Sequence, residues 1–386
     1  MKPKERKQFF KENHEKLTAP QMAEVLGVQP QTIRKYEQEF GACKAEHERE
    51  AEPKEILFAE RKARKLTESD KANKKKIRVL ADENDKLAKE LEAIMFLKEN
   101  IASYNIPLRQ SKKDSSATAV ALISDWHIEE RVKPDHISFL NEYTVAIARI
   151  RAESVFVNVL KLLEKERTTV GISELVVYLL GDYISNDIHD ELMENTELLP
   201  IDAIIEAQRL LVSGLDYLLK HSKCTLTVVC HSGNHARTTQ KTRHATEAGH
   251  SLEYFMYSNL SEHYRKDKRI HFVIPRGYHA YTDINGFVIR SHHGHALKYG
   301  GGVGGIFIPT YKSIAQWNKG KPADLDVFGH FHQRKDGGNF LCNGSVIGYN
   351  EYALSIKADY ELPAQTFFLV DHKRKLKTNV SPIFCD

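Results

Sequence analysis

An α/β fold preceded by an all-α front segment is the fold class that this 386-residue sequence predicts. From residue 118 onward, runs rich in β-branched residues alternate with long amphipathic helical patterns, which is typical of α/β proteins. Asn285-Gly286 separates two of these runs and indicates a tight hairpin, so we expect some antiparallel strands. Residues 1–108 show only helical patterns.

Length and composition narrow the class of protein. The chain is longer than one ordinary domain, so two or more units are expected. A content of 41% hydrophobic and 28% charged residues is typical of soluble globular proteins, and no run of 18 apolar residues exists to span a membrane. The basic N-terminus, MKPKERKQFF, lacks the apolar stretch of a secretory signal. CxxC spacing is absent among Cys43, Cys224, Cys230, Cys342 and Cys385. We therefore expect a reduced, cytoplasmic protein.

Residues 1–43 contain a helix-turn-helix pattern. With Ala19 as its first position, the apolar, small and glycine positions of the pattern are filled by Met22, Ala23, Leu26, Gly27, Val28, Ile33 and Tyr36. Gly27 permits the left-handed backbone of the turn, and Pro30 suits the first turn of the second helix.

The second helix of this pattern predicts DNA as a partner. It would present side chains that contact base edges or phosphates in a major groove, namely Gln29, Gln31, Thr32, Arg34 and Lys35. Residues 1–114 also carry 26 Lys+Arg against 21 Asp+Glu, a net charge of +5, whereas the remainder carries −1. The alternative is a small helical unit that docks a protein.

Residues 44–108 form a charged segment that predicts a coiled-coil helix. With Ile77 at heptad position a, position a also holds Leu91, and the d positions hold Leu66, Leu80, Leu87, Ile94 and Ile101. Polar residues fall on the seam as well, namely Asp70, Asn73, Asn84 and Lys98. We expect a homodimer through residues 63–101; the alternative is a solvated helix that folds back on the catalytic domain. A polar linker follows at 109–117, before a domain at 118–386.

In that last domain, the period of the apolar residues predicts the elements. The expected strands are 118–124, 174–180, 224–230, 270–274, 279–283, 287–291, 326–328 and 366–370. The expected helices are 139–167, 201–221 and 246–264.

Five motifs bearing aspartate and histidine occur in order through this domain. They are Asp125-Trp126-His127, Gly181-Asp182, Gly233-Asn234-His235, His292-His293-Gly294 and Gly329-His330-Phe331-His332. Each begins at or near the carboxyl end of a predicted strand, which is where open α/β sheets bind ligands. Aspartate, asparagine and histidine suit Mn²⁺, Fe or Zn²⁺, and a pair of such ions can clamp both oxygens of a phosphoryl transfer.

In this order the motifs resemble the calcineurin-like metallophosphoesterases over residues 118–386. The helix-turn-helix and coil resemble phage-encoded members of exonuclease-like type. The resemblance implies a β-sandwich flanked by helices and two divalent ions, with Mn²⁺ the first choice and Fe or Zn²⁺ the others. It places one ion on Asp125, His127 and His332, the other on Asn234, His293 and His330, and Asp182 between them.

The same resemblance implies hydrolysis by a hydroxide held between the two metals. His235 would protonate the departing alkoxide or steady the phosphate, although Ala236 stands where many nuclease relatives have an aspartate that orients this histidine. We assign Arg237 to the substrate phosphate; the alternative is a surface arginine.

These observations favour a nuclease or DNA phosphodiesterase over two alternatives. One is a phosphomonoesterase or protein phosphatase with a docking N-terminus. The other is a catalytically inactive DNA-binding regulator, which the complete set of ligand types disfavours. The basic front segment favours DNA over a monoester substrate.

Overall fold

The computed structural model describes residues 2–14, 16–40, 53–99, 115–188, 190–298 and 304–386. Contacts divide the chain into two units, Met1–Pro107 and Leu108–Asp386. Of the expected linker at 109–117, residues 109–114 lie outside the described residues, as do Cys43 and Ile101. The finer boundaries after residues 43, 108 and 117 stay predictions.

The front of the first unit consists of short helices around a small apolar core. They are α1 (Pro3–Asn13), α2 (Ala19–Leu26) and α3 (Pro30–Phe40). Gly27 has a φ of 57° and a ψ of 46°, the left-handed backbone expected of the turn between α2 and α3. Ala23 and Ile33 are buried in the core with Phe10. The apolar positions of the sequence pattern therefore face inward.

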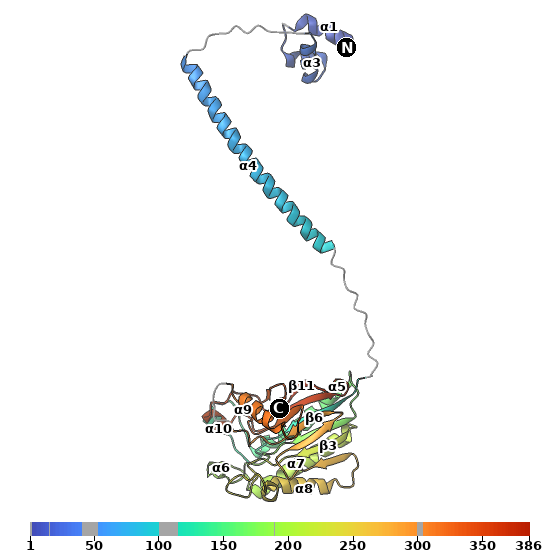
Figure 1. The fold of residues 1–386 in the computed structure, drawn as a ribbon, viewed down its shortest axis with the longest axis vertical. Helices are drawn as coiled ribbons and strands as arrows, with labels where there is room; N and C mark the ends of the chain where they lie inside the picture. Colours follow the sequence, from blue (N-terminus) through green and yellow to red (C-terminus); the bar gives the residue numbers. More distant parts are fainter. Residues whose placement is uncertain (1, 15, 41–52, 100–114, 189, 299–303) are drawn as a thin grey trace. The chain divides into compact units, whose positions relative to one another are not determined.

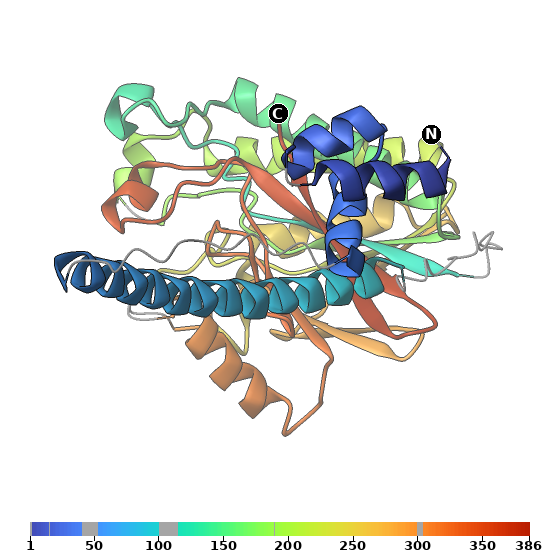
Figure 2. The same cartoon turned by 90° about the horizontal axis from the view of Figure 1, so that it is seen from above.

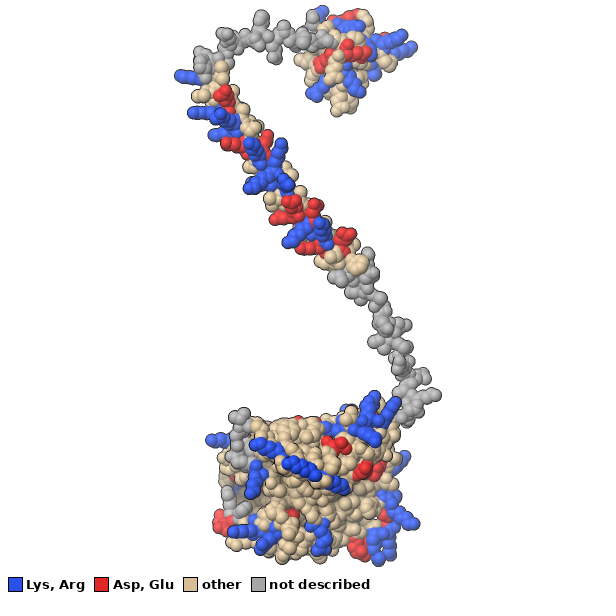
Figure 3. All heavy atoms as spheres, in the orientation of Figure 1, with Lys and Arg blue, Asp and Glu red and all other residues tan. Residues whose placement is uncertain are grey.

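A single continuous helix, α4 (Pro53–Glu99), makes up the rest of the described part of this unit (Figure 2). Basic and acidic side chains both occur along its length, with uncharged residues between them (Figure 3). Large apolar side chains at the expected seam are exposed, including Ile77 at 64%, Leu80 at 61% and Leu87 at 62%. None of the described helices has both the length and the apolar character needed to cross a bilayer.

The second unit contains two sheets (Figure 1). In the first sheet the strand order is β11-β10-β1-β2-β3-β4, and β1 to β4 are parallel. Its strands are β1 (Ala117–Ile123), β2 (Glu174–Leu179), β3 (Thr225–Cys230), β4 (Ile270–Val273), β10 (Ala364–Asp371) and β11 (Leu376–Phe384). Both β10 and β11 are antiparallel to their neighbours.

In the second sheet the strand order is β5-β6-β7-β9-β8. Its strands are β5 (Ala280–Ile284), β6 (Phe287–Ser291), β7 (Leu325–Phe328), β8 (Lys335–Asp336) and β9 (Phe340–Cys342). Asn285 and Gly286 join β5 to β6 with φ values of 52° and 83°. Positive φ at both positions is the geometry of a two-residue hairpin turn, so the hairpin prediction is confirmed.

Alternate residues of the first sheet enter two different cores. Val120 and Val176 pack against Ile289 and Val327 of the second sheet, while Ala121 and Val177 face the long helices. These helices are α5 (Val145–Arg167), α7 (Pro200–His221) and α8 (Leu252–His263). On the second sheet, α9 (Phe307–Trp317) packs over Phe340. The predicted α/β class is confirmed, with two sheets sharing one core and helices on both outer sides.

Two helices begin later than predicted. The helix expected from residue 139 begins at Val145, because Ser138 and Phe139 have φ values of 57° and 61°, after a 3-10 helix over Pro134–Ile137. The helix expected from residue 246 begins at Leu252, since Ser251 caps it by accepting from the N–H of Tyr254. A 3-10 helix (Glu247–His250) precedes it. Elements that the sequence pattern missed are α6 (Asp190–Glu194), α10 (Glu351–Ser355), α9, β8, β9 and β11.

Candidate metal centre

The five motifs meet at one end of the two sheets. Asp125, Asp182 and Asn234 follow the carboxyl ends of β1, β2 and β3, while His293 and His330 follow β6 and β7. Backbone hydrogen bonds join the loops: the N–H of Asp125 donates to the carbonyl of Gly181 at 2.9 Å, and that of Gly329 donates to His293 at 2.8 Å. Parallel strands end at a common edge, so residues far apart in sequence become neighbours there.

Strained backbone marks the same loops. Left-handed φ values between 48° and 71° occur at Asp125, His127, Asp182, His330 and His332. Non-glycine residues in this conformation cost free energy and cluster at functional sites.

The glycines of the second and third motifs permit the closest approach in the site. A Cβ on Gly181 would clash with the backbone of Gly233, and one on Gly233 would clash with the Asp182 carboxylate. Glycine is therefore required where these loops touch.

Ligand-type atoms gather in two groups. In one, the Nε2 atoms of His127 and His332 lie 3.2 Å apart, and Asp125 Oδ1 lies 3.5 Å from His332 Nε2. In the other, Asp182, His293 and His330 place one ligand atom each within 4.8 Å of one another.

Asp182 also groups with His127 and His235, so it lies between the two clusters. Its Oδ2 is 2.8 Å from His293 Nε2, and Asn234 Oδ1 is 3.2 Å from the same nitrogen. The structure thus brings all seven sequence-predicted ligands together. Carboxylates and imidazoles converging on one point fit a divalent metal, and the described clusters could hold such ions; they do not determine which metal.

Burial and neighbouring charges set the protonation of the groups in the metal-free site. Burial holds the pKa of His127 and His330 well below its usual value, so both imidazoles are neutral, the form that binds metal. Burial would raise the pKa of Asp182, but His293 and His235 lower it to well below normal. Burial likewise opposes the charge on His293, yet Asp182 raises its pKa to about 10, so this imidazole is protonated at neutral pH and would lose that proton on binding a metal.

Hydrogen bonds fix the ring orientations. His127 Nδ1 lies 2.7 Å from Ser185 Oγ, which donates to Glu130 Oε2 at 2.9 Å; Asn350 donates to the other oxygen of Glu130. His293 Nδ1 donates to the carbonyl of Leu180 at 2.6 Å. In both histidines Nδ1 takes part in this hydrogen bond, so Nε2 is the nitrogen that points into the site.

His235 is oriented by the backbone instead of by an aspartate. Its Nδ1 donates to the carbonyl of Ser185 at 3.0 Å, and its own N–H donates to Asp182 Oδ1 at 2.9 Å. The ring stands edge-on to His127, with centroids 4.8 Å apart. The Ser185 carbonyl thus takes the place of the orienting side chain that Ala236 lacks.

Arg237 is bound to its own loop. Its guanidinium donates to the carbonyls of Asn234 at 2.6 Å and Thr239 at 3.1 Å, and it approaches that of Gln240 at 3.4 Å. These bonds hold the loop that carries Asn234, and the expected phosphate contact stays a prediction. His292, in contrast, lies in the core, stacked on Phe328 with centroids 5.1 Å apart.

Sequence reasoning missed Glu253, the residue that ties two ligand loops together. Its buried carboxylate accepts from the N–H of Tyr183 at 2.6 Å and from that of Gly233 at 2.7 Å. Burial, and then the Asp182 charge, raise the pKa of Glu253 to about 8. A signal existed: Glu253 shares a helical face with Met256, Tyr257 and Leu260, where a carboxylate is out of place.

The expected DNA-contacting residues belong to the other unit. Gln29, Gln31, Arg34 and Lys35 are exposed at or on α3, and Thr32 is half-buried.

Matches to known proteins come from solved structures. No protein-family model matches the sequence, and no curated protein does. Hypothetical protein PH1004 from Pyrococcus horikoshii OT3 is similar at 14% identity and a TM-score of 0.34, over 69% of this chain and 87% of that chain. Vps29 from Chaetomium thermophilum is similar at 12% identity and a TM-score of 0.27, over 66% of this chain and 84% of that chain. Protein AQ665 of unknown function from Aquifex aeolicus is similar at 15% identity and a TM-score of 0.26, over 59% of this chain and 89% of that chain. With TM-scores below 0.5, these likenesses carry no functional inference.

Proposed function

We propose that this protein is a two-metal phosphoesterase of calcineurin-like type that hydrolyses phosphodiester bonds in DNA. One observation carries the proposal: the buried Asp182 carboxylate is shared between groups of ligand atoms that five separate loops bring together. A shared carboxylate is what a pair of neighbouring cations requires, and paired cations suit the displacement at phosphorus.

The proposed ligand sets follow the two clusters. One ion would be held by Asp125, His127 and His332 and the second by Asn234, His293 and His330, with Asp182 contributing to both. Mn²⁺ is the proposed metal, with Fe and Zn²⁺ as the other options. When bound, such ions lower the pKa of water and neutralise charge on the phosphate.

The chain's own contribution to the reaction lies with His235. Because the Ser185 carbonyl holds its Nδ1 proton, Nε2 is the atom that can donate to the departing alkoxide or to a phosphate oxygen. Loss of this donor should slow the chemical step and leave metal content unchanged.

DNA is the proposed substrate because of the front unit. The exposed side of α3 carries Gln31, Arg34 and Lys35, groups that bind bases and phosphates, next to a turn of the expected geometry. The exposed apolar seam of α4 supports a homodimer through residues 63–101. A pair of DNA-binding units would raise affinity through two simultaneous contacts.

The test is a comparison of substrates. Purified protein with Mn²⁺, Mg²⁺ or Zn²⁺ is offered linear and circular DNA, p-nitrophenyl phosphate and its bis ester. We expect cleavage of DNA and of the bis ester. Turnover of the monoester alone would instead identify a phosphomonoesterase, and no turnover of any substrate in any metal would favour the inactive regulator.

A further inference from the structure

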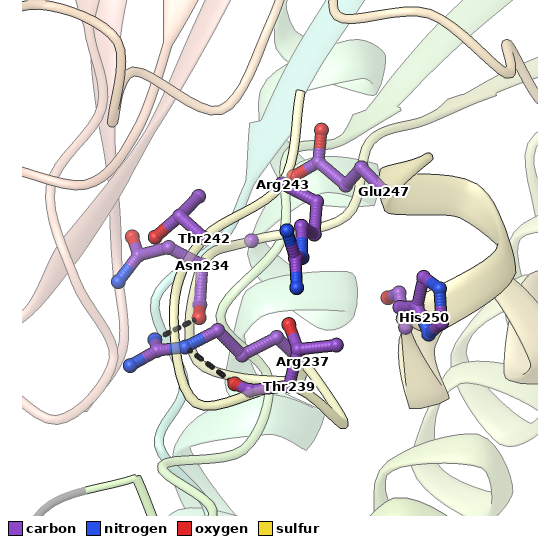
Figure 4. A pocket seen from close by; sticks show the side chains of 9 residues that line it. Asn234, Arg237, Thr239, Thr242, Arg243, Glu247 and His250 are labelled. Carbon is purple, nitrogen blue, oxygen red and sulfur yellow. Dashed lines mark hydrogen bonds between the residues drawn. The ribbon is translucent and has the colours of Figure 1, made fainter. Parts of the chain in front are cut away.

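A shallow hollow opens beside Asn234, within the loop that connects β3 to α8 (Figure 4). Residues 236–251 of that loop carry Arg237, Lys241 and Arg243 against a single acidic residue, Glu247. In Figure 4 the Arg243 side chain extends between Asn234 and His250. A cationic hollow thus adjoins a proposed metal ligand.

The two arginines of the hollow have different tasks. The Arg237 guanidinium donates to carbonyls of its own loop and thereby fixes the shape of the loop that lines the hollow. Arg243 is exposed, and within the described residues no hydrogen bond or ion pair engages its guanidinium. Glu247 faces His295, with its carboxylate 3.6 Å from Nε2. Arg243 is therefore the cation of the hollow that is available to a ligand.

We propose that this hollow binds the phosphate adjacent to the scissile one along a nucleic-acid strand, with Arg243 as the residue that determines this specificity. The inference rests on the proposed function and sharpens its substrate class. A guanidinium offers paired N–H donors that match two phosphate oxygens. A monoester or a small diester has no second phosphate, so it gains nothing from Arg243.

The test is the Arg243→Ala variant of the full chain. We expect KM for a single-stranded oligonucleotide to rise about tenfold, a loss typical of one charged hydrogen-bonding pair, with kcat nearly unchanged. Turnover of bis(p-nitrophenyl) phosphate should stay at the wild-type rate. Arg243→Lys should restore part of the affinity, and Lys220→Ala, which removes an exposed lysine at the end of α7, should change neither substrate.

The outcomes separate the two claims. Equal oligonucleotide kinetics in wild type and Arg243→Ala would overturn the subsite while leaving the nuclease intact. Equal loss with both substrates would overturn it too, because Arg243 would then act at the reacting phosphate. A wild-type protein that cleaves no nucleic acid would overturn the proposed function and the subsite together.

A second inference concerns the direction of pairing along α4. The heptad frame of Ile77 extends back to Ile56, also an a position, which is 51% exposed. In a parallel dimer each a or d residue meets its own copy, so Asp70 would meet Asp70 of the partner subunit. Like charges inside a seam are strongly unfavourable.

An antiparallel dimer has one register that separates these like charges, with Asp70 set against the partner's Leu87. Aligning Asn84 with the partner's Asn73 pairs the two amides with each other. The same alignment sets Ile77 against the partner's Leu80 and Leu91 against the partner's Leu66. Amide then meets amide and apolar meets apolar at the centre of the helix.

The flanking charges favour the same register. Lys76 and Glu83 both occupy g positions, which face each other in antiparallel coils. Each Lys76 would lie beside Glu83 of the partner subunit, giving two ion pairs. In a parallel coil g positions face e positions, and those partners would be Ala81 and Ala88, which offer no charge.

We infer that two copies of this chain pair through antiparallel α4 helices. Over 47 residues the helix is about 70 Å long, so the two DNA-binding units leave from opposite ends of the rod. This arrangement deepens the dimer of the proposed function and does not depend on the nuclease activity.

Disulfide trapping in full-length protein tests the direction. Two variants are made in a Cys43→Ser background, one with Leu66→Cys and the other with Leu91→Cys, each carrying a different tag. Each variant is expressed alone and the two are co-expressed, and all three samples are then oxidised mildly. We expect a covalent dimer only in the mixed sample, joining one copy of each variant. Covalent dimers in each single variant would show parallel pairing, and a monomer by light scattering would remove the coil altogether; either result overturns the inference.

Discussion

At the scale of single residues, Asp182 carries more of the site than any other side chain. One of its oxygens accepts the N–H of His235 and the other contacts His293. Its neighbours Gly181 and Gly233 leave no space for a larger group. Asp182 therefore supplies negative charge to the site, contacts His235 and His293, and has a strained backbone itself.

Replacing Asp182 by Asn should abolish the metal pair. The amide keeps the shape but loses the charge that two cations share, so we expect a lower metal content by elemental analysis and at least about a hundredfold loss of bis ester turnover. Asp187→Asn, at an exposed position of the same loop, is the matched control. Full metal content with full activity in Asp182→Asn would reject the bridging role.

Glu253 predicts a pH dependence of stability in the metal-free protein. Its folded pKa of about 8 lies above the ordinary 4.5, so the folded protein binds this proton more tightly than the unfolded chain does. The free energy of unfolding should fall as pH rises from about 4.5 to 8, by up to about 1.4 kcal/mol per pH unit. Below and above this window the group contributes no slope.

Urea unfolding of the wild type and of Glu253→Gln in EDTA, at pH 5.5 and 7.5, measures this term. The variant should show the shallower pH dependence, because its amide does not titrate. Glu262→Gln alters an exposed carboxylate on the same helix and should behave as wild type. Identical pH dependence in wild type and Glu253→Gln would contradict the assignment.

The order of the motifs predicted which side chains would lie together in the site. It could not predict which other residues orient them. The ligands follow strands whose apolar runs are plain in the sequence, so their meeting at one edge follows from parallel topology. Glu253, Ser185 and Glu130 act through backbone groups or through a histidine ring, as single residues with no recurring spacing. Glu253 could have been recognised only as a carboxylate on an otherwise apolar helix face.

At the scale of elements, the strongest periodic patterns were the ones predicted well. Buried parallel strands read as continuous apolar runs, which explains the agreement for β1, β2 and β3. Short or half-exposed strands carry little pattern: β9 has three residues, and β11 has mostly half-buried side chains and contains Pro382. Helix starts were missed because caps at Thr144 and Ser251 lie inside the apolar pattern.

The α3 helix gives a prediction about binding. Arg34→Ala and Lys35→Ala should each weaken DNA binding and lower the salt dependence by about one phosphate contact, without changing turnover of the bis ester. Fluorescence anisotropy at several salt concentrations measures both quantities. Lys4→Ala, on the exposed side of α1, is the control. Unchanged affinity in both α3 variants would favour a protein dock over DNA.

The contact between α5 and α7 gives a prediction about stability. A Cβ on Gly214 would overlap the ring of Phe156, so Gly214→Ala must push these helices apart. Overpacking costs about 1–3 kcal/mol, which exceeds the gain of about 1 kcal/mol from alanine's helix propensity. Urea unfolding should show a net loss, whereas Ser213→Ala on the same helix should be nearly neutral. A stabilised Gly214→Ala would mean that the helices are free to shift.

At the scale of the whole molecule, the exposed seam of α4 predicts a dimer. Light scattering of the full chain should give about 88 kDa, twice the 44.2 kDa of one chain. A catalytic unit expressed alone from residue 115 should be monomeric, because the seam lies outside it. A full-length mass of 44 kDa at micromolar concentration would contradict the dimer.

The placement of β10 beside β1, near the middle of the first sheet, bears on how the protein is synthesised. The strand that flanks the earliest strand of the catalytic unit is made about 240 residues after it. Until residue 371 leaves the ribosome, β1 keeps an open, apolar flank, the kind of edge that recruits chaperones or aggregates. Translation products that end between residues 332 and 371 should therefore be insoluble, even though they contain all five motifs.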